Sequence, residues 1–413
     1  MKVPEPLSTA FGAPFEELIS RFATDQKLLT EPSEIRSQRF LARSVVPHVK
    51  KLSSVFNRFE SDASHGLAPY WKESSNPRNL RLAYFLYFMP SNLFRVSSII
   101  AELSRLGFRW NASKTLKGLE LGAGPAAGAC GIAAGEKYAP IGIPSVGNWA
   151  LIEQDKGMLE LGSEWAAEYF RFVHPEADWG IRNFHRTIEL EKGLLPKAAP
   201  QFNLWVCSYY LNESSLPPEK IAPLLIDAWE KHLEDEGLAI IVEPALKLQS
   251  RKLLAIRKAL LAEAEVRGID WLKILAPCLG HQACGALAAP DDWCHEDVSW
   301  WRPPYFKTID QMAGLDRKSL PFSYLAITKS KRTHQELLPA IKSHRSTQRL
   351  VSPAHSEGKE LEFFLCGEEG KRRARYRPKT EEEEEINRGD ILINAEIRGD
   401  VNSSRVESLK SIL

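Results

Sequence analysis

Three cysteines and two histidines lie in one short stretch of the sequence that is rich in glycine, proline and tryptophan. Five residues separate Cys278 from Cys284, nine separate Cys284 from Cys294, and His281 and His295 lie among them. Zinc sites usually have two to four residues between paired ligands, so this spacing is not that of a standard zinc knuckle. Widely spaced thiolates in a flexible loop instead suit an iron–sulfur cluster, which takes four cysteines.

A fourth thiolate for such a cluster must come from elsewhere in the chain. Cys366 ends a strand-like run of residues far downstream, and it would join that part of the chain to the loop. Two other interpretations stay open on spacing alone. The three cysteines of the loop are unrelated buried residues, or they bind zinc together with His281 or His295.

A second stretch, residues 119–128, reads Leu-Glu-Leu-Gly-Ala-Gly-Pro-Ala-Ala-Gly between a predicted strand and a predicted helix. Its small residues let the backbone pass close to a ligand, and the start of the helix offers free N–H groups. A dinucleotide fingerprint would have its third glycine at position 127, where this chain has Ala127.

Two acidic residues make the prediction for this loop more specific. Glu120 lies two residues before Gly122, where methyltransferase loops have an acid that faces the methionine end of S-adenosylmethionine. Glu153 ends the next apolar strand, where a carboxylate accepts hydrogen bonds from both ribose hydroxyls. The two acids together indicate a nucleotide-type loop, in which Glu120 and Glu153 would face an S-adenosylmethionine molecule. The alternative is a sheet without a nucleotide, whose carboxylates cap helices.

The sequence predicts no catalytic residue. Methyltransferases that act on amino groups of bases have a polar residue and two prolines after the fourth strand, but residues 208–213 contain no proline. A carbon-directed reaction needs a nucleophilic cysteine, and Cys207 is better explained as a buried strand residue.

Strands and helices alternate around these motifs. Apolar strands are predicted at 118–121, 149–152, 202–207 and 238–242, and helices at 218–236 and 250–267. This order predicts an α/β fold, with a parallel, doubly wound sheet covered on both faces. A late strand at 322–328 returns to the sheet, which makes the cysteine stretch an insertion.

Three domains follow from this pattern. Residues 1–110 form a helical domain, since apolar residues recur at helical spacing from about residue 14 to 108. Residues 111–330 form a methyltransferase-like domain with the metal-binding insertion at 275–305. Residues 331–413 form a basic connector and a small β-rich domain with strands at 361–366 and 391–397.

The composition is that of an ordinary globular protein, with 54 Lys and Arg against 53 Asp and Glu. Positive charge is concentrated in two places, where a solvated helix face and a phosphate-binding surface are both possible. Residues 371–379 hold six basic residues. The other segment, residues 35–58, has no acid and contains Arg36, Arg39, Arg43, Lys50, Lys51 and Arg58.

No stretch of the sequence predicts a membrane span or a targeting signal. The longest uncharged stretches fall short of the roughly 20 apolar residues that cross a bilayer. The N-terminal acids Glu5, Glu16 and Glu17 argue against a secretory signal and a mitochondrial presequence. The predicted location is the cytoplasm.

Four stretches together resemble a methyltransferase-like family associated with assembly of the small ribosomal subunit: 83–91, 119–128, 241–244 and 277–295. The resemblance implies a Rossmann-like class I methyltransferase fold that binds S-adenosylmethionine at Glu120, Gly122, Gly124 and Glu153. It also implies a four-iron four-sulfur cluster on Cys278, Cys284, Cys294 and Cys366. The implied partners are the small ribosomal subunit and its RNA, and the expected state is a monomer.

Two other functions compete with this one. The first is a methyltransferase that acts on a small molecule or a protein and has a structural zinc site. The second is a redox sensor that binds RNA only while its cluster is intact.

Overall fold

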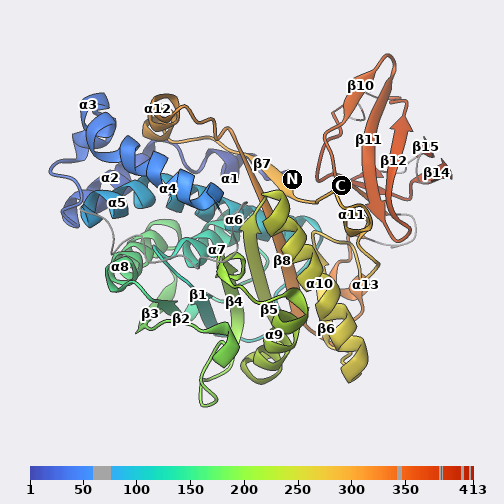
Figure 1. Cartoon of the computed structure of the whole chain (residues 1–413), viewed down its shortest axis with the longest axis horizontal. Helices are drawn as coiled ribbons and strands as arrows, with labels where there is room; N and C mark the ends of the chain where they lie inside the picture. The colour runs from blue at the N-terminus through green and yellow to red at the C-terminus, as the bar shows by residue number, and fades with distance from the viewer. Residues whose placement is uncertain (59–75, 342–346, 381–382, 384, 401–403, 409–410) are drawn as a thin grey trace.

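The central sheet of the protein has the strand order of a class I methyltransferase. The computed structural model describes residues 1–58, 76–341, 347–380, 383, 385–400, 404–408 and 411–413. In this part of the chain the strands of the first sheet follow the order β3-β2-β1-β4-β5-β8-β6, and β7 pairs with β8 (Figure 1). The strands are β1 Leu116–Leu121, β2 Val146–Glu153, β3 Asp178–His185, β4 Phe202–Ser208, β5 Leu233–Pro244, β6 Leu272–Ala276, β7 Glu296–Ser299 and β8 Ser319–Lys329.

Along this order, every strand runs in the same direction except β8. The ladder from β3 to β5 is parallel throughout, whereas β8 runs antiparallel to both β5 and β6. The predicted all-parallel sheet is therefore wrong at this edge, although the late strand does return to the sheet as predicted. A reversed strand inserted between the fifth and sixth is typical of class I methyltransferases, so the predicted fold class is confirmed.

Helices cover both faces of the sheet, as the apolar strands predicted. Alternate residues of β4 belong to two different apolar cores, with Val206 on one face and Trp205 on the other. The helices after β1 are α7 Ala127–Tyr138, α8 Lys156–Val173, η4 Leu190–Lys192, η5 Leu211–Glu213, α9 Pro218–His232, α10 Lys247–Arg267, α11 Gly285–Ala288, α12 Pro304–Ala313 and α13 His334–Leu337.

The N-terminal region is helical, as the apolar spacing predicted. Its helices are α1 Glu5–Thr9, α2 Ala13–Asp25, η1 Pro32–Arg36, α3 Gln38–Phe40, η2 Leu41–Val45, α4 Val46–Arg58, α5 Pro77–Ala83, η3 Tyr84–Phe88 and α6 Met89–Arg105. Trp165 of α8 contacts the rings of Phe15, Phe22 and Phe85 edge-on at 5.2–6.1 Å. These helices therefore share one apolar core with a face of the sheet.

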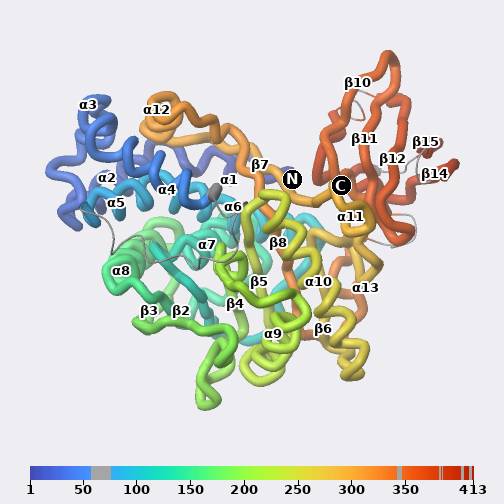
Figure 2. The backbone as a smooth tube through the Cα atoms, viewed as in Figure 1, coloured from blue at the N-terminus to red at the C-terminus, as the bar shows by residue number. Residues whose placement is uncertain are grey.

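A second sheet forms the C-terminal part of the chain, which we call the tail. Its strand order is β14-β15-β12-β11-β9-β13-β16, with β10 beside β11, and it has an apolar core of its own. The tail stands next to the body, where α11 lies close to it (Figures 1 and 2). Its strands are β9 Gln348–Leu350, β10 His355–Glu357, β11 Glu360–Gly367, β12 Gly370–Tyr376, β13 Ile391–Ile393, β14 Glu396–Gly399, β15 Ser404–Ser408 and β16 Ser411–Ile412.

None of the helices in the described part of the chain is both long enough and apolar enough to span a membrane.

Candidate functional site

The loop between β1 and α7 turns sharply at the carboxyl end of the sheet. Gly122 and Gly124 have φ angles of +64° and +49°, and Ala126 also has a positive φ of +57°. Gly128 opens the helix at a point where a Cβ atom would lie 2.6 Å from both Glu120 Oε1 and Val206 Cγ1. The small residues that the sequence singled out are therefore required by the backbone conformation and by close packing.

Glu120 supports the start of α7 from beneath the loop. Its two carboxylate oxygens accept hydrogen bonds from the N–H groups of Gly128 and Ala129, each at 2.8 Å. Burial raises the pKa of Glu120 to about 8, against the effect of these two donors. In this arrangement Glu120 caps helix α7. This is the role expected if the sheet binds no nucleotide and its carboxylates cap helices.

Glu153 lies at the end of β2 and turns toward the same loop. Its Oε2 accepts a hydrogen bond from the N–H of Gly124 at 2.9 Å, and its Oε1 accepts one from the N–H of Asp155. Burial raises the pKa of Glu153. The structure thus brings Glu120, Gly122, Gly124 and Glu153 together at one edge of the sheet.

The side chains of Glu213, Glu243 and Tyr84 also lie at this edge, and none of them was predicted as a cofactor ligand. Burial raises the pKa of Glu213 and of Glu243 to about 8, and the negative charges of Glu243 and Glu153 add to the effect at Glu213. Tyr84 of η3 lies close enough to Glu153 and Glu213 for their charges to raise its pKa further, in addition to burial. The edge is therefore rich in carboxyl groups and suits a ligand that carries positive charge.

The loop after β4 offers polar groups but no activated nucleophile. Cys207 is 7% exposed within an apolar core, and burial raises the pKa of its thiol well above the usual value. Ser208 Oγ and Asn212 Oδ1 are buried and have no hydrogen-bond partner among the described residues.

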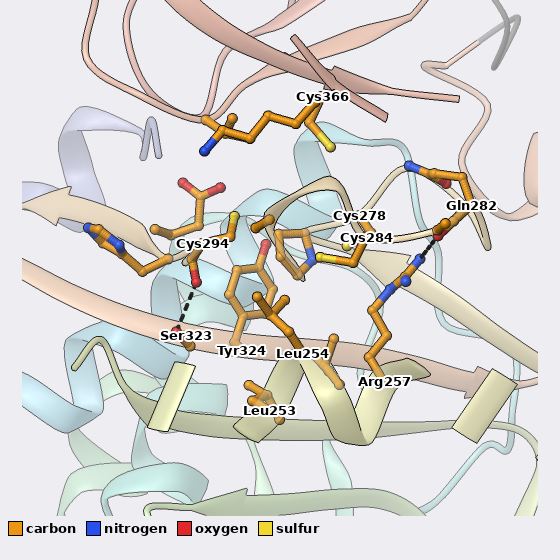
Figure 3. A pocket seen from close by; sticks show the side chains of 18 residues that line it. Leu253, Leu254, Arg257, Cys278, Gln282, Cys284, Cys294, Ser323, Tyr324 and Cys366 are labelled. Atoms are coloured by element: carbon orange, nitrogen blue, oxygen red, sulfur yellow. Dashed lines mark hydrogen bonds between the residues drawn. The ribbon is translucent and has the colours of Figure 1, made fainter. Parts of the chain in front are cut away.

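The four cysteines that the sequence grouped line a single cavity (Figure 3). Cys278, Cys284 and Cys294 come from the segment between β6 and β8, while Cys366 reaches toward them from β11 of the tail. All four thiols are free. The cavity has a volume of about 40 Å³.

Two arginines of α10 hold the cysteine segment in place. Arg257 donates to the carbonyl oxygens of Gly280 at 2.8 Å and Gln282 at 3.0 Å. Arg251 donates to the carbonyl oxygens of Ala286, Ala289 and Asp292. The first arginine fixes the turn between Cys278 and Cys284, and the second fixes the turn between Cys284 and Cys294.

The two histidines of the segment have different roles. His281 Nε2 accepts a hydrogen bond from the N–H of Ile274 in strand β6, so this nitrogen is already used within the protein. His295 lines the cavity, and its buried Nδ1 has no hydrogen-bond partner among the described residues. Of the two histidines, His295 is therefore the one placed to bind a metal.

Single-ion geometry is not present at the cavity. Among the described residues, no three His, Cys, Asp or Glu side chains are grouped closely enough to hold one metal ion. Four thiolates around one zinc ion would lie only about 3.8 Å apart, given Zn–S bonds of about 2.3 Å.

The two basic segments differ in how their charges are used. Arg39, Arg43, Lys50 and Lys51 are exposed, and none has an acidic partner among the described residues, while the side chain of Arg58 lies outside those described. In the tail, Arg373 and Arg375 both pair with Glu362, and Arg372 pairs with Glu369. Arg36 of the N-terminal segment is itself paired with Glu16. We call the four exposed cations Arg39, Arg43, Lys50 and Lys51 the α3–α4 basic surface.

Sequence comparison assigns the chain to a family. The family model described as mitochondrial small ribosomal subunit Rsm22 matches residues 78–391. The chain belongs to the Rsm22 family. This match confirms the resemblance seen in the sequence, and the matched range includes the glycine loop and all four cysteines that line the cavity. No curated protein has significant sequence similarity to the chain.

Several solved structures that match the chain are described as methyltransferases. The chain is 12% identical to precorrin-6y C5,15-methyltransferase from Geobacter metallireducens, with a TM-score of 0.29, over 57% of this chain and 87% of that one. It is 16% identical to the ribosomal protein L11 methylase from Lactobacillus delbrueckii subsp. bulgaricus (TM-score 0.28, 55% and 77%). It is 12% identical to the N-terminal domain of human METTL16 in complex with SAH (TM-score 0.28, 62% and 71%). Because these scores are low, the fold assignment rests on the strand order.

Proposed function

We propose that the protein is an assembly factor for the small ribosomal subunit, which acts in the cytoplasm and binds S-adenosylmethionine, ribosomal RNA and an iron–sulfur cluster. Membership of the Rsm22 family and the methyltransferase sheet support the general assignment. The observation that carries the specific proposal is the meeting of four cysteines from two separate parts of the chain at one cavity.

The surroundings of the cavity fit a cluster better than a single zinc ion. A four-iron four-sulfur core binds one thiolate at each of four corners, so its ligands must be spread around the core. The four cysteines line one cavity and come to it from two separate parts of the chain. We propose Cys278, Cys284, Cys294 and Cys366 as the ligands, and the bound core would supply a compact link between tail and body.

The carboxyl end of β1 and β2 fits S-adenosylmethionine. This cofactor carries a sulfonium and an ammonium group, and the edge presents the carboxyl groups of Glu120, Glu153 and Glu213. Glu153 is only half-buried and already accepts hydrogen bonds at the glycine loop. We propose that it accepts the ribose hydroxyls of the cofactor when the cofactor binds.

The Glu153→Gln variant should bind S-adenosylmethionine about 10- to 100-fold more weakly than the wild-type protein. A hydrogen bond to a charged group is worth about 1.5–3 kcal/mol, and each 1.4 kcal/mol is a factor of ten in affinity. Isothermal titration calorimetry measures the effect. Glu160→Gln is the matched control, since Glu160 is an exposed residue of α8. Equal affinity of all three proteins would remove Glu153 from the cofactor site, and no binding by the wild type would refute the cofactor itself.

The α3–α4 basic surface is our proposed contact for RNA phosphates. Its four cations are exposed and have no acidic partner among the residues that the structure describes, so each can neutralise a phosphate. Replacing Arg39, Arg43, Lys50 and Lys51 together by alanine should weaken RNA binding. It should also reduce the slope of log K against log salt by about one for each phosphate that is no longer neutralised. Fluorescence anisotropy with transcribed small-subunit ribosomal RNA at several salt concentrations measures both effects.

Arg373 and Arg375 provide the control for this experiment. Their side chains are exposed like those of the basic surface, but Glu362 already neutralises them in part. The double alanine variant should therefore change RNA affinity less than the four substitutions in α3, η2 and α4. If the tail variant has the larger effect, the tail is the RNA contact and the proposed surface is wrong.

Co-sedimentation with small ribosomal subunits tests the assembly role itself. Binding at low salt that falls steeply at high salt supports the proposal, because phosphate contacts release counterions. Protein that stays free under both conditions contradicts it.

The second candidate is a methyltransferase that acts on a small molecule or a protein, with a zinc site. The buried and unpartnered Asn212 Oδ1 and His295 Nδ1 favour it, since the first could orient a substrate and the second could bind zinc. Methyl transfer to a metabolite or protein extract, without ribosome association, would select this candidate.

A further inference from the structure

Helix α10 presents a buried arginine to the wall of the cysteine cavity. The side chain of Arg257 points from the helix toward the turn between Cys278 and Cys284 (Figure 3). Only 1% of its surface is exposed. Neither the family match nor the sequence patterns singled out this residue.

The charge of Arg257 has no acidic partner. Among the described residues, no carboxylate lies within ion-pair distance of its guanidinium, and its Nε has no hydrogen-bond partner. Its two hydrogen bonds go to the neutral carbonyl groups of Gly280 and Gln282. A buried charge is costly unless an opposite charge compensates it.

Arg349, another buried arginine, differs from Arg257 in its ion pairs. Arg349 is paired with two buried carboxylates, Glu102 and Glu296. The carboxylate of Glu296 also lines the cavity but is paired with Arg349, whereas the charge of Arg257 acts on the thiols of Cys278 and Cys366. The missing negative charge is therefore expected inside the cavity.

We propose that Arg257 is a positioning residue for an anionic metal–thiolate centre: it fixes the turn between two ligands and supplies the positive charge that balances the centre. The inference rests on the proposed metal centre and adds to it a residue outside the ligand set. Net charge and hydrogen bonds around an iron–sulfur cluster set its reduction potential. Because reduction adds an electron, a nearby cation stabilises the reduced form more than the oxidised form.

The Arg257→Gln variant should hold its cluster at a lower reduction potential. We expect the ratio of reduced to oxidised cluster at a fixed potential to fall at least tenfold, which corresponds to a shift of about 59 mV for one electron. Arg257→Lys keeps the charge and should lie between wild type and Arg257→Gln. The variant Arg251→Gln is the matched control, because Arg251 also holds carbonyl groups of the segment but does not line the cavity. It should lower cluster content without changing the potential.

The experiment uses the full chain, purified and reconstituted without oxygen. Iron, sulfide and zinc content are measured first, then the midpoint potential by titration with a dye-buffered reductant. A lower potential in Arg257→Gln, with Arg257→Lys closer to wild type, supports the inference. If Arg257→Gln retains no cluster, support requires that Arg257→Lys retains more of it than Arg257→Gln does.

Two results overturn the inference. The first is an Arg257→Gln variant whose cluster content and midpoint potential both equal those of the wild type. The second is the same change in Arg257→Gln, Arg257→Lys and Arg251→Gln, which would show that only the packing of the segment matters. A wild-type protein that binds no metal would instead refute the metal centre, and this is seen before any variant is compared.

Discussion

Replacing Arg349 with methionine should lower the free energy of unfolding by about 3–5 kcal/mol, the usual cost of breaking a buried ion pair by removing one partner. Arg349 lies on β9 of the tail and is 3% exposed at its side chain. It pairs with Glu102 of α6 and, at 3.3 Å, with Glu296 of β7, and both carboxylates are buried. The substitution would leave these acids facing each other without their shared cation.

Urea unfolding followed by fluorescence measures this loss, and limited proteolysis shows whether the tail separates first. Arg373→Met is the matched control in the same sheet. Arg373 pairs with Glu362 on the surface, and an exposed pair is worth about 0–1 kcal/mol. Equal effects of the two substitutions would show that the ion pair at Arg349 does not hold the tail to the body.

The same ion pairs predict how stability depends on pH. Burial alone would raise the pKa of Glu102, but the charges of Arg105 and Arg349 prevail and lower it to about 2. Glu296 and Tyr324 also face Arg349. A carboxyl group whose pKa is lower in the folded state stabilises the fold above its unfolded pKa of about 4.5. This contribution is lost as the pH falls from about 4.5 toward 2.

In Arg349→Met the pKa of Glu102 should rise, so the variant should lose less stability than the wild type over this acidic range. Unfolding curves at pH 7, 4 and 3 measure the difference between the two proteins. If both proteins lose the same amount of unfolding free energy between pH 7 and 3, the acid-dependent loss does not come from Glu102.

Much of the body could be predicted from the sequence because its buried strands are apolar runs. The predicted strand at 202–207 corresponds to β4, and the one at 118–121 lies within β1. The glycine loop was also recognisable, since its small residues are set by local backbone geometry at Gly122 and Gly124. Local rules of this kind need no knowledge of distant parts of the chain.

The strands that were missed do not have apolar runs. Strand β3 lies at the edge of the sheet and exposes most of its last residues, so its sequence is polar. Strand β12 alternates exposed Arg373 and Arg375 with buried Ala374 and Tyr376. Because this strand carries many charges, the alternation of buried and exposed residues is hard to recognise in its sequence, which indicates a basic run instead.

Long-range partners were the least predictable. Glu102 and Arg349 meet across 247 positions of the sequence, and nothing local marks either as buried. Arg251 and Arg257 belong to a correctly predicted helix, but their role depends on the segment that packs against it. The exception is Cys366, which the predicted cluster needed as a fourth ligand and which lies at the same cavity as the other three cysteines.

The Cys366→Ser variant should therefore lose most of its bound iron and sulfide. A serine hydroxyl remains protonated at neutral pH and is a poorer ligand than a thiolate, so the cluster would be held by three residues of the body alone. The link between tail and body would disappear together with the fourth ligand, and the tail should become more sensitive to protease. Iron and sulfide analysis with the visible absorption spectrum measures the first effect, and timed proteolysis measures the second.

Cys207→Ala is the control, because Cys207 is a buried cysteine that does not line the cavity. It should keep the metal content of the wild type. If Cys366→Ser also keeps it, the fourth ligand is another group, and His295 is the first alternative because its free nitrogen lies at the same cavity. Loss of metal in His295→Ala but not in Cys366→Ser would then assign the centre to the body alone, and Arg349 would remain as the buried contact between body and tail.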